Sequence, residues 1–266
     1  MSASPKNGAG EPPYRVVAVR YGTLETTRGA LLGEDASGKG PDAPMRLDYF
    51  FWVIRNRRRT ILVDTGFRRE DGEARGRTML RDPEPALDGI RGSSEVEALL
   101  LTHLHYDHTG NLEMAEEAPV LVGATEFEYW AQDAVREGPQ ASLVEPEDLG
   151  RLDSLHRAGR VCLLGEEEFI APGVRVRCVG GHTPGQLIVE IAGAEGPVIL
   201  ASDALHLYEE LDGSCLFADT IDAYAARRTN ARLRELAESG ARVVPGHDPL
   251  VTERFPALAN GVYRIC

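Results

Sequence analysis

Apolar positions along the chain fall into short continuous runs and longer stretches with helical spacing. Runs rich in β-branched and aromatic residues, bounded by turn-forming residues, predict strands. Apolar residues that recur at a period near 3.6 predict helices at 125–137 and 221–239, and a shorter helix is expected near 85–90. The predicted strands are 14–20, 49–54, 60–63, 98–101, 120–122, 174–179, 187–191, 198–201 and 241–244.

The order of these elements is strands, helix, strands, helix, which predicts two β-sheets packed face to face with helices outside. This is an α/β fold with an αββα arrangement. Residues 1–13 are rich in Pro, Gly and Ser and read as a flexible N-terminal tail, whereas 14–266 are expected to form a single domain. The polar stretch 138–160 has no clear pattern. We interpret the charged run 55–59 as a solvated turn and the aromatic run 49–52 as core.

Composition narrows the classes of function. Hydrophobic residues make up 42% of the chain, which is enough for a full core. The formal net charge of −13 disfavours nucleic acid, since a phosphate backbone is bound by Lys and Arg. No run approaches the ~18 apolar residues of a membrane span. An apolar signal-peptide core is also lacking near the start, and the cysteines have no paired spacing, so we expect a cytoplasmic protein with reduced thiols.

The strongest chemical signal is the segment His103-Leu-His105-Tyr-Asp107-His108, directly after the buried run 98–101. Side chains two residues apart in an extended segment point the same way, so His103 and His105 can reach one metal ion together. Asp107 and His108 come where Gly110 indicates a turn, and they can address a second ion beside the first. Imidazole and carboxylate groups suit a divalent ion such as zinc. The spacing therefore predicts a metal site.

Three more candidate ligands follow predicted strands. His182 lies in Gly-Gly-His-Thr-Pro-Gly after 174–179, Asp203 follows 198–201, and His247 lies in Pro-Gly-His-Asp after 241–244. Small and turn-forming residues beside each one let the backbone approach a ligand cluster. A single loop histidine is usually only solvated, but three such residues beside the first segment strengthen the prediction of a metal centre.

The sequence at this point resembles the metallo-β-lactamase superfamily over nearly its whole length from about residue 15. The resemblance implies an αββα sandwich with two adjacent metal ions. His103, His105 and His182 would bind the first ion, Asp107, His108 and His247 the second, and Asp203 would bridge them. Asp64 would orient a ligand, or would only form a turn. The matching motifs are Asp64-Thr-Gly66, His103-x-His105-x-Asp107-His108, Gly181-His-Thr-Pro-Gly185, Ser202-Asp203 and Pro245-Gly-His247.

Hydrolysis of an activated acyl bond follows from that ligand set. A water shared by two Zn²⁺ ions would lose a proton near neutral pH, because one zinc ion already lowers the pKa of water to roughly 7. The resulting hydroxide would attack a carbonyl polarised by the metal. Asp107 or Asp203 could carry the proton to the leaving group. Fe or Mn²⁺ could replace Zn²⁺, since such sites accept all three.

Within the superfamily the layout is most like the N-acyl-homoserine lactonases, so we expect a metal-dependent hydrolase that opens a small lactone ring. Those enzymes typically carry a tyrosine three positions after the bridging aspartate, where this chain has His206. His206 could donate a hydrogen bond to the substrate carbonyl, Tyr208 could do so if the loop bulges, or His206 could be a surface residue without a role. Lactone specificity depends on which of these holds.

Two alternatives remain open from the sequence. A thioester hydrolase of the hydroxyacylglutathione hydrolase type uses the same ligands, but its basic C-terminal segment is not matched here, where only Arg254 and Arg264 follow His247. A metal-binding ligand sensor without catalytic activity is the other. The expected partner is a small lactone or another activated acyl compound, and the resemblance is compatible with a homodimer.

Overall fold

A computed structural model describes residues 12–91 and 95–266. The predicted N-terminal tail therefore lies outside the described residues except for Pro12 and Pro13. The two expected sheets are present, together with a small third one. The large sheet has the strand order β15-β16-β1-β3-β4-β6-β7-β8, with β5 paired to β1. Its strands are β1 (Arg15–Thr27), β3 (Pro44–Arg55), β4 (Thr60–Val63), β5 (Thr78–Met79), β6 (Ala98–Leu101), β7 (Val120–Gly123), β8 (Val161–Leu164), β15 (Ala257–Ala259) and β16 (Val262–Arg264).

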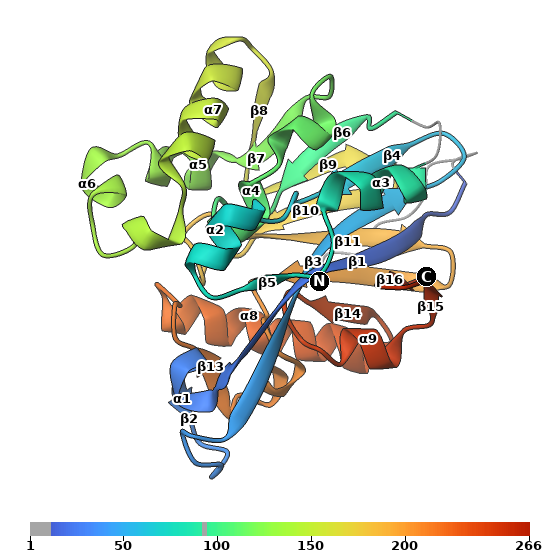
Figure 1. The fold of residues 1–266 in the computed structure, drawn as a ribbon. Helices are drawn as coiled ribbons and strands as arrows, with labels where there is room; N and C mark the ends of the chain where they lie inside the picture. Colours follow the sequence, from blue (N-terminus) through green and yellow to red (C-terminus); the bar gives the residue numbers. More distant parts are fainter. Residues whose placement is uncertain (1–11, 92–94) are drawn as a thin grey trace.

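The second sheet faces the first and has the order β14-β12-β11-β10-β9. A separate two-stranded sheet pairs β13 with β2, and Figure 1 shows it beyond the far ends of β1 and β3. The strands of these two sheets are β9 (Glu167–Ala171), β10 (Val174–Cys178), β11 (Leu187–Gly193), β12 (Gly196–Ser202), β14 (Arg242–Pro245), β2 (Leu32–Asp35) and β13 (Cys215–Phe217).

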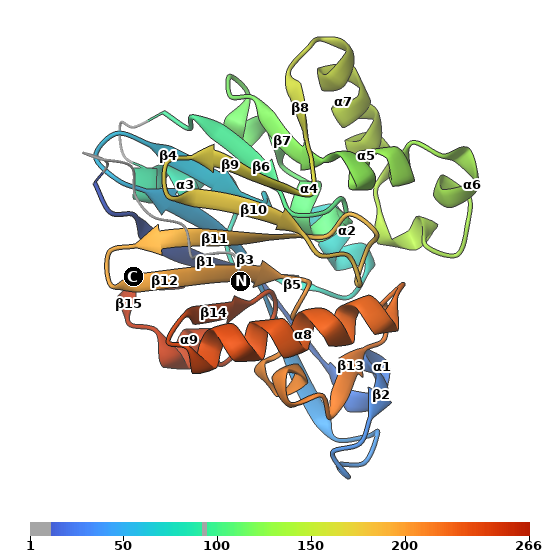
Figure 2. The same ribbon diagram turned by 180° about the vertical axis from the view of Figure 1, so that it is seen from behind.

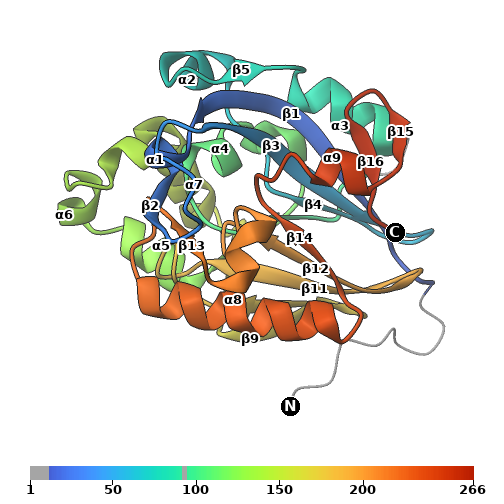
Figure 3. The same cartoon turned by 90° about the horizontal axis from the view of Figure 1, so that it is seen from below.

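Helices cover the outer face of each sheet, which confirms the predicted αββα layers. Seen from below, α2 and α3 lie over β1 and β3, and α8 runs along the opposite side beneath β12 and β11 (Figure 3). The view from behind shows α8 crossing below the second sheet (Figure 2). The helices are α1 (Arg28–Leu31), α2 (Arg69–Ala74), α3 (Pro83–Arg91), α4 (Tyr106–Thr109), α5 (Ala124–Trp130), α6 (Asp133–Arg136), α7 (Pro146–Arg157), α8 (Ala223–Glu238) and α9 (Val251–Arg254), with short 3₁₀ turns η1 (Leu112–Ala115), η2 (Ala141–Leu143) and η3 (Tyr208–Asp212).

The aromatic run of β3 explains how the layers are held together. Phe50 and Trp52 point into the core between the two sheets, whereas Tyr49 and Phe51 point into the core beneath the outer helices. Successive side chains of a strand face opposite sides, so a strand covered on both faces must be apolar throughout. The prediction that 49–52 belong to the core is confirmed, and all four side chains are buried.

One predicted helix differs from the structure, and the stretch left unassigned contains helices. The helix expected over 125–137 is two helices, α5 and α6, because Gln132 between them takes an extended backbone and the Arg136 side chain bonds to the Trp130 carbonyl at the end of α5. The unassigned stretch 138–160 contains η2 and α7, whose apolar residues Leu149 and Leu152 are buried. Within the part of the chain that the structure describes, no helix has both the length and the apolar character that a bilayer crossing requires.

Candidate metal centre

The strands bring the candidate ligands together at one edge of the sandwich. His103 and His105 follow β6, and Asp107 and His108 lie in the single turn of α4 that comes next. The other three ligands follow three strands of the second sheet, β10, β12 and β14. All seven side chains are buried despite their polarity: His103, His105, Asp107, His108, His182, Asp203 and His247.

The side chains divide into overlapping groups, each close enough to hold one metal ion. One group is His103, His105 and His182, and a second is Asp107, His108 and His247; within each, one donor atom per residue lies within 4.8 Å of the others. Asp203 meets the same criterion with His103 and His108, so it lies between the two groups. Its Oδ2 is 3.1 Å from His247 Nε2.

Orphaned nitrogens show that the cluster fits metal ions. His103 and His108 each turn a buried Nε2 toward Asp203, and neither nitrogen has a hydrogen-bond partner among the described residues. A buried polar atom left unpaired costs free energy unless something else satisfies it. His105 Nδ1 and His182 Nε2 approach to 2.9 Å, where at most one proton can be shared. Imidazole nitrogens and carboxylate oxygens gathered in this way are the donor set of zinc and related divalent ions.

Burial and charge set the protonation of these groups. Burial lowers the pKa of His103 and His182 well below the usual value and lowers that of His105 to about 4, so these imidazoles are neutral, as metal ligands must be. Burial acts the same way on His108, but the carboxylates of Asp203 and Asp64 outweigh it and raise the pKa of His108. Although burial opposes its charge, Asp203 has a lowered pKa because His247 and His108 surround it.

Asp64 contacts one of these candidate ligands, the arrangement that the sequence resemblance implied. Its Oδ2 lies 2.8 Å from His108 Nδ1, which leaves Nε2 of that ring to face the cluster. The same carboxylate accepts hydrogen bonds from the Thr102 backbone N–H and hydroxyl, both at 2.8 Å. Asp64 has φ of +59°, a left-handed conformation that Asp adopts more readily than most residues. It therefore fixes the orientation of His108 and ties it to the end of β6.

Glu126 was missed by the sequence analysis. Its side chain is fully buried and accepts hydrogen bonds from Leu104 N (3.0 Å), Trp130 Nε1 (2.9 Å) and Gly185 N (3.0 Å). Leu104 lies between the first two histidine ligands and Gly185 closes the loop of His182, so this carboxylate joins two ligand-bearing loops. A glutamate on a short amphipathic helix is normally predicted to face solvent, and no signal in the sequence indicates that Glu126 is buried.

Glycines in two motifs permit close approach of these loops. A Cβ on Gly246 would lie 2.6 Å from Asp203 Oδ1, and a Cβ on Gly185 would collide with the backbone of Glu126. Any larger residue would push His247 or His182 away from the cluster.

His206 joins the cluster, whereas Tyr208 does not. The Nε2 of His206 is 3.3 Å from Asp203 Oδ2. The His206 ring stacks on the Phe217 ring, with 3.7 Å between the ring centroids. His206, His182 and Asp203 also form a group close enough to hold one metal ion. Burial opposes its charge, but Asp203 and Glu210 raise the pKa of His206 to about 9. The Tyr208 hydroxyl instead donates to the Val243 carbonyl at 3.1 Å. Tyr208 is therefore withdrawn as a candidate catalytic residue, because the loop does not bulge to bring it to the cluster.

A pocket of about 350 Å³ leads to the metal cluster. Apolar side chains from β1, β3 and β13 line one part of it, among them Leu24, Leu47 and Phe217. Arg77 lies in its wall and donates through Nε to the Tyr49 hydroxyl at 3.1 Å. The Tyr49 ring in turn packs against His247 at 4.9 Å. The cluster is thus open to a small molecule with both apolar and polar parts.

Comparison of the sequence with curated proteins finds two kinds of hydrolase among its relatives. N-acyl homoserine lactonase AiiA of Bacillus thuringiensis subsp. kurstaki is 28% identical over 153 residues, which cover 56% of this chain and 55% of that protein. Hydroxyacylglutathione hydrolase of Alkalilimnicola ehrlichii is 30% identical over 172 residues, 62% of this chain and 53% of that protein. The matches thus span about half the length of these relatives.

Solved structures share the fold at low sequence identity. A quorum-quenching N-acyl homoserine lactone lactonase superposes with a TM-score of 0.73 at 20% identity, covering 97% of this chain and 98% of that one. The dizinc quorum-quenching lactonase AidC gives 0.71 at 17% identity, covering 99% and 96%. The model of the metallo-beta-lactamase superfamily matches residues 46–247, which include all seven candidate ligands. The chain therefore belongs to the metallo-beta-lactamase superfamily.

Proposed function

We propose that this chain is a hydrolase that uses two divalent metal ions, Zn²⁺ in the first instance, to open the ring of an N-acyl-homoserine lactone or a related small lactone. The observation that carries the proposal is a buried cluster of seven histidine and aspartate ligands at the base of an open pocket. Relatives named as N-acyl homoserine lactonases support the choice of a lactone. The proposal treats residues 14–266 as one hydrolase domain.

The metal ions would supply the electrophile and the activated water, since bound divalent ions lower the pKa of water and polarise an acyl carbonyl. The protein's own groups then divide the remaining tasks. His206 lines the pocket, and its buried Nε2, which lies 3.3 Å from Asp203 Oδ2, makes no hydrogen bond among the described residues, so it can donate one to the substrate carbonyl oxygen. The carboxylates of Asp107 and Asp203 both line the pocket and can move a proton to the leaving alkoxide.

The pocket also matches the two ends of an acylated lactone. The acyl chain would pack on Leu24, Leu47 and Phe217. Arg77 makes no ion pair among the described residues, and its hydrogen bonds go to Tyr49 and to a backbone carbonyl. Its guanidinium is therefore available to the amide oxygen of the acyl group, which accepts hydrogen bonds.

A thioester hydrolase is the second candidate, because hydroxyacylglutathione hydrolase is among the relatives. The two are separated by giving zinc-loaded protein short-chain and long-chain N-acyl-homoserine lactones and, in parallel, an acylglutathione thioester. Mass spectrometry would follow the gain of one water by the lactone, and thiol release would follow cleavage of the thioester.

The lactonase proposal expects metal-dependent ring opening that exceeds thioester cleavage in kcat/KM, and loss of turnover with reduced metal content in His108→Ala and Asp203→Asn. Asp133→Asn, at an exposed position on α6, is the matched control and should behave like the unaltered protein. Intact lactones with rapid thiol release would replace the proposal by the thioesterase. Normal turnover in either ligand variant would overturn both.

A further inference from the structure

A second cavity lies far from the metal cluster. It has a volume of about 1060 Å³ and is bounded by the start of β1, the end of β3, helix α3 and the β15–β16 hairpin. Arg15 of β1 lines this groove, whereas Leu24 of the same strand lines the metal pocket. The interval from 15 to 24 spans roughly 30 Å of extended strand. The groove is therefore separate from the proposed hydrolytic site.

Four arginines line this groove, and none of them forms an ion pair among the residues that the structure describes: Arg15, Arg55, Arg57 and Arg81. Arg55 bonds only to the Ile90 carbonyl. Arg81 bonds to the Asn260 carbonyl at 2.5 Å, and its Nε is buried without a hydrogen-bond partner in the described part of the chain. By contrast, Arg28, Arg68 and Arg175 each have a carboxylate partner within 3 Å.

The register of β1 with β3 places two of these arginines side by side. Arg15 and Arg55 are directly paired across β1 and β3, so their side chains leave the same face of the sheet side by side. In the second sheet, by comparison, Arg175 of β10 is directly paired with Glu190 of β11, and these two side chains form an ion pair. Like charges directly opposite one another destabilise a sheet. Among residues 12–91 and 95–266, no carboxylate forms an ion pair with Arg15 or Arg55, so an anionic group would stabilise this pair.

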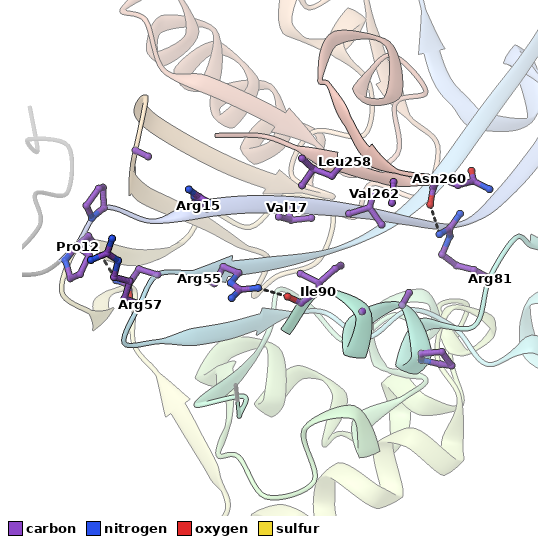
Figure 4. Close-up of a pocket in the computed structure, with 17 residues that line it drawn as sticks. Pro12, Arg15, Val17, Arg55, Arg57, Arg81, Ile90, Leu258, Asn260 and Val262 are labelled. Carbon is purple, nitrogen blue, oxygen red and sulfur yellow. Dashed lines mark hydrogen bonds between the residues drawn. The ribbon is translucent and has the colours of Figure 1, made fainter. Parts of the chain in front are cut away.

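The middle of the groove is apolar. Figure 4 shows Arg15, Arg55 and Arg57 toward one end, Arg81 at the other, and Val17, Ile90, Leu258 and Val262 between them. Val17 and Val262 are buried, whereas the Leu258 side chain is 58% exposed. A ligand that satisfies both parts has an anionic head beside the three arginines and a hydrocarbon chain along these side chains.

We propose that this groove binds a single-chain acyl carboxylate, that is, a free fatty acid of medium length. The carboxylate accepts hydrogen bonds from Arg15 and Arg55, with Arg57 beside them, and the chain covers the exposed Leu258 along the apolar middle of the groove. The sequence interpretation of 55–59 as a solvated turn is incomplete in this respect, since Arg55 and Arg57 both line the groove. This site does not depend on the proposed lactonase activity.

Calorimetric titration of the full-length protein with dodecanoate tests the proposal. Dodecanol carries the same chain without the charge, and acetate carries the charge without the chain. We expect dodecanoate to bind at one site, and both comparison compounds to bind at least about tenfold more weakly, a difference of ~1.4 kcal/mol. The double variant Arg15→Gln/Arg55→Gln should weaken dodecanoate binding by at least about tenfold, with unchanged far-UV circular dichroism.

Arg57→Gln gives a second test that cannot disturb folding, because this exposed side chain makes no hydrogen bond or ion pair in the described residues. It should also weaken binding. Arg232→Gln, at an exposed arginine on α8, is the control and should not. The proposal is overturned if the groove variants bind dodecanoate as tightly as the unaltered protein. It is equally overturned if Arg77→Gln, in the metal pocket, is the variant that loses binding, or if only anionic phospholipid vesicles bind.

Discussion

The link between Asp64 and His108 gives the sharpest test of how the metal centre is built. In Asp64→Asn one carboxylate oxygen becomes an NH₂ group of nearly the same size. If that group replaces Oδ2, it faces two donors, His108 Nδ1 and the Thr102 hydroxyl; if it replaces Oδ1, it faces only the Thr102 backbone N–H. The side chain should therefore take the second orientation. Asn tolerates a φ of +59°, so the change adds no backbone strain.

Two effects follow, and both can be estimated. One buried N–H loses its acceptor, which should reduce the free energy of unfolding by about 1–3 kcal/mol. The His108 ring keeps its hydrogen bond but loses the neighbouring negative charge that makes it a stronger metal ligand. Groups that orient a metal ligand in this way typically contribute about 10–100-fold to metal affinity, equivalent to ~1.4–2.7 kcal/mol.

The assay is competition of the protein with a chromophoric chelator for Zn²⁺, which resolves the affinities of two sites, together with thermal unfolding. Asp64→Asn should weaken the site formed by Asp107, His108 and His247 by about 10–100-fold. The site formed by His103, His105 and His182 should keep its affinity. Asp133→Asn again serves as the control. Unchanged affinity at both sites in a folded variant would refute the role given to Asp64.

Three further predictions concern single residues. Glu126→Gln should lower the free energy of unfolding by about 1–3 kcal/mol, because one of three buried N–H donors loses its acceptor, and a melting curve should shift by roughly 2–4 °C per kcal/mol. His206→Ala should lower kcat for a lactone by about 10²–10³ with the metal content retained, and His206→Gln should recover part of the loss; equal kcat in all three proteins would remove His206 from the reaction. The metal-free protein should lose stability as the pH falls from about 6.5 toward 4, because His105 has a pKa near 6.5 in the unfolded chain but a pKa of about 4 in the folded one. Urea unfolding at several pH values measures this. The free energy of unfolding should depend less steeply on pH in His105→Gln.

The sequence was informative where chemistry and periodicity coincide. Strands covered on both faces are continuously apolar, and the ligands follow strand ends, so the two sheets and the metal cluster could both be predicted. The short strands β15 and β16 were missed, because three residues are too few for alternation to show. Their pairing with β1 depends on long-range register rather than local pattern.

Side-chain direction inside loops could not be predicted. Tyr208 and His206 are two residues apart in a segment whose backbone enters the 3₁₀ turn η3, so spacing alone does not say which one faces the cluster. Glu126 was hidden because its partners come from loops distant in sequence. The arginine-lined groove was hidden for the same reason, since Arg15 and Arg55 meet only through the register of β1 with β3.

The central claim is that the seven-ligand cluster binds two divalent ions and that both are needed for hydrolysis. Its most direct test is the rate of N-acyl-homoserine lactone ring opening, measured while Zn²⁺ is added stepwise to metal-free protein and the bound metal per chain is determined at each step. The account predicts that the rate rises mainly with the second ion and reaches a plateau at two ions per chain. A full rate at one ion per chain, or two bound ions without ring opening, would contradict it.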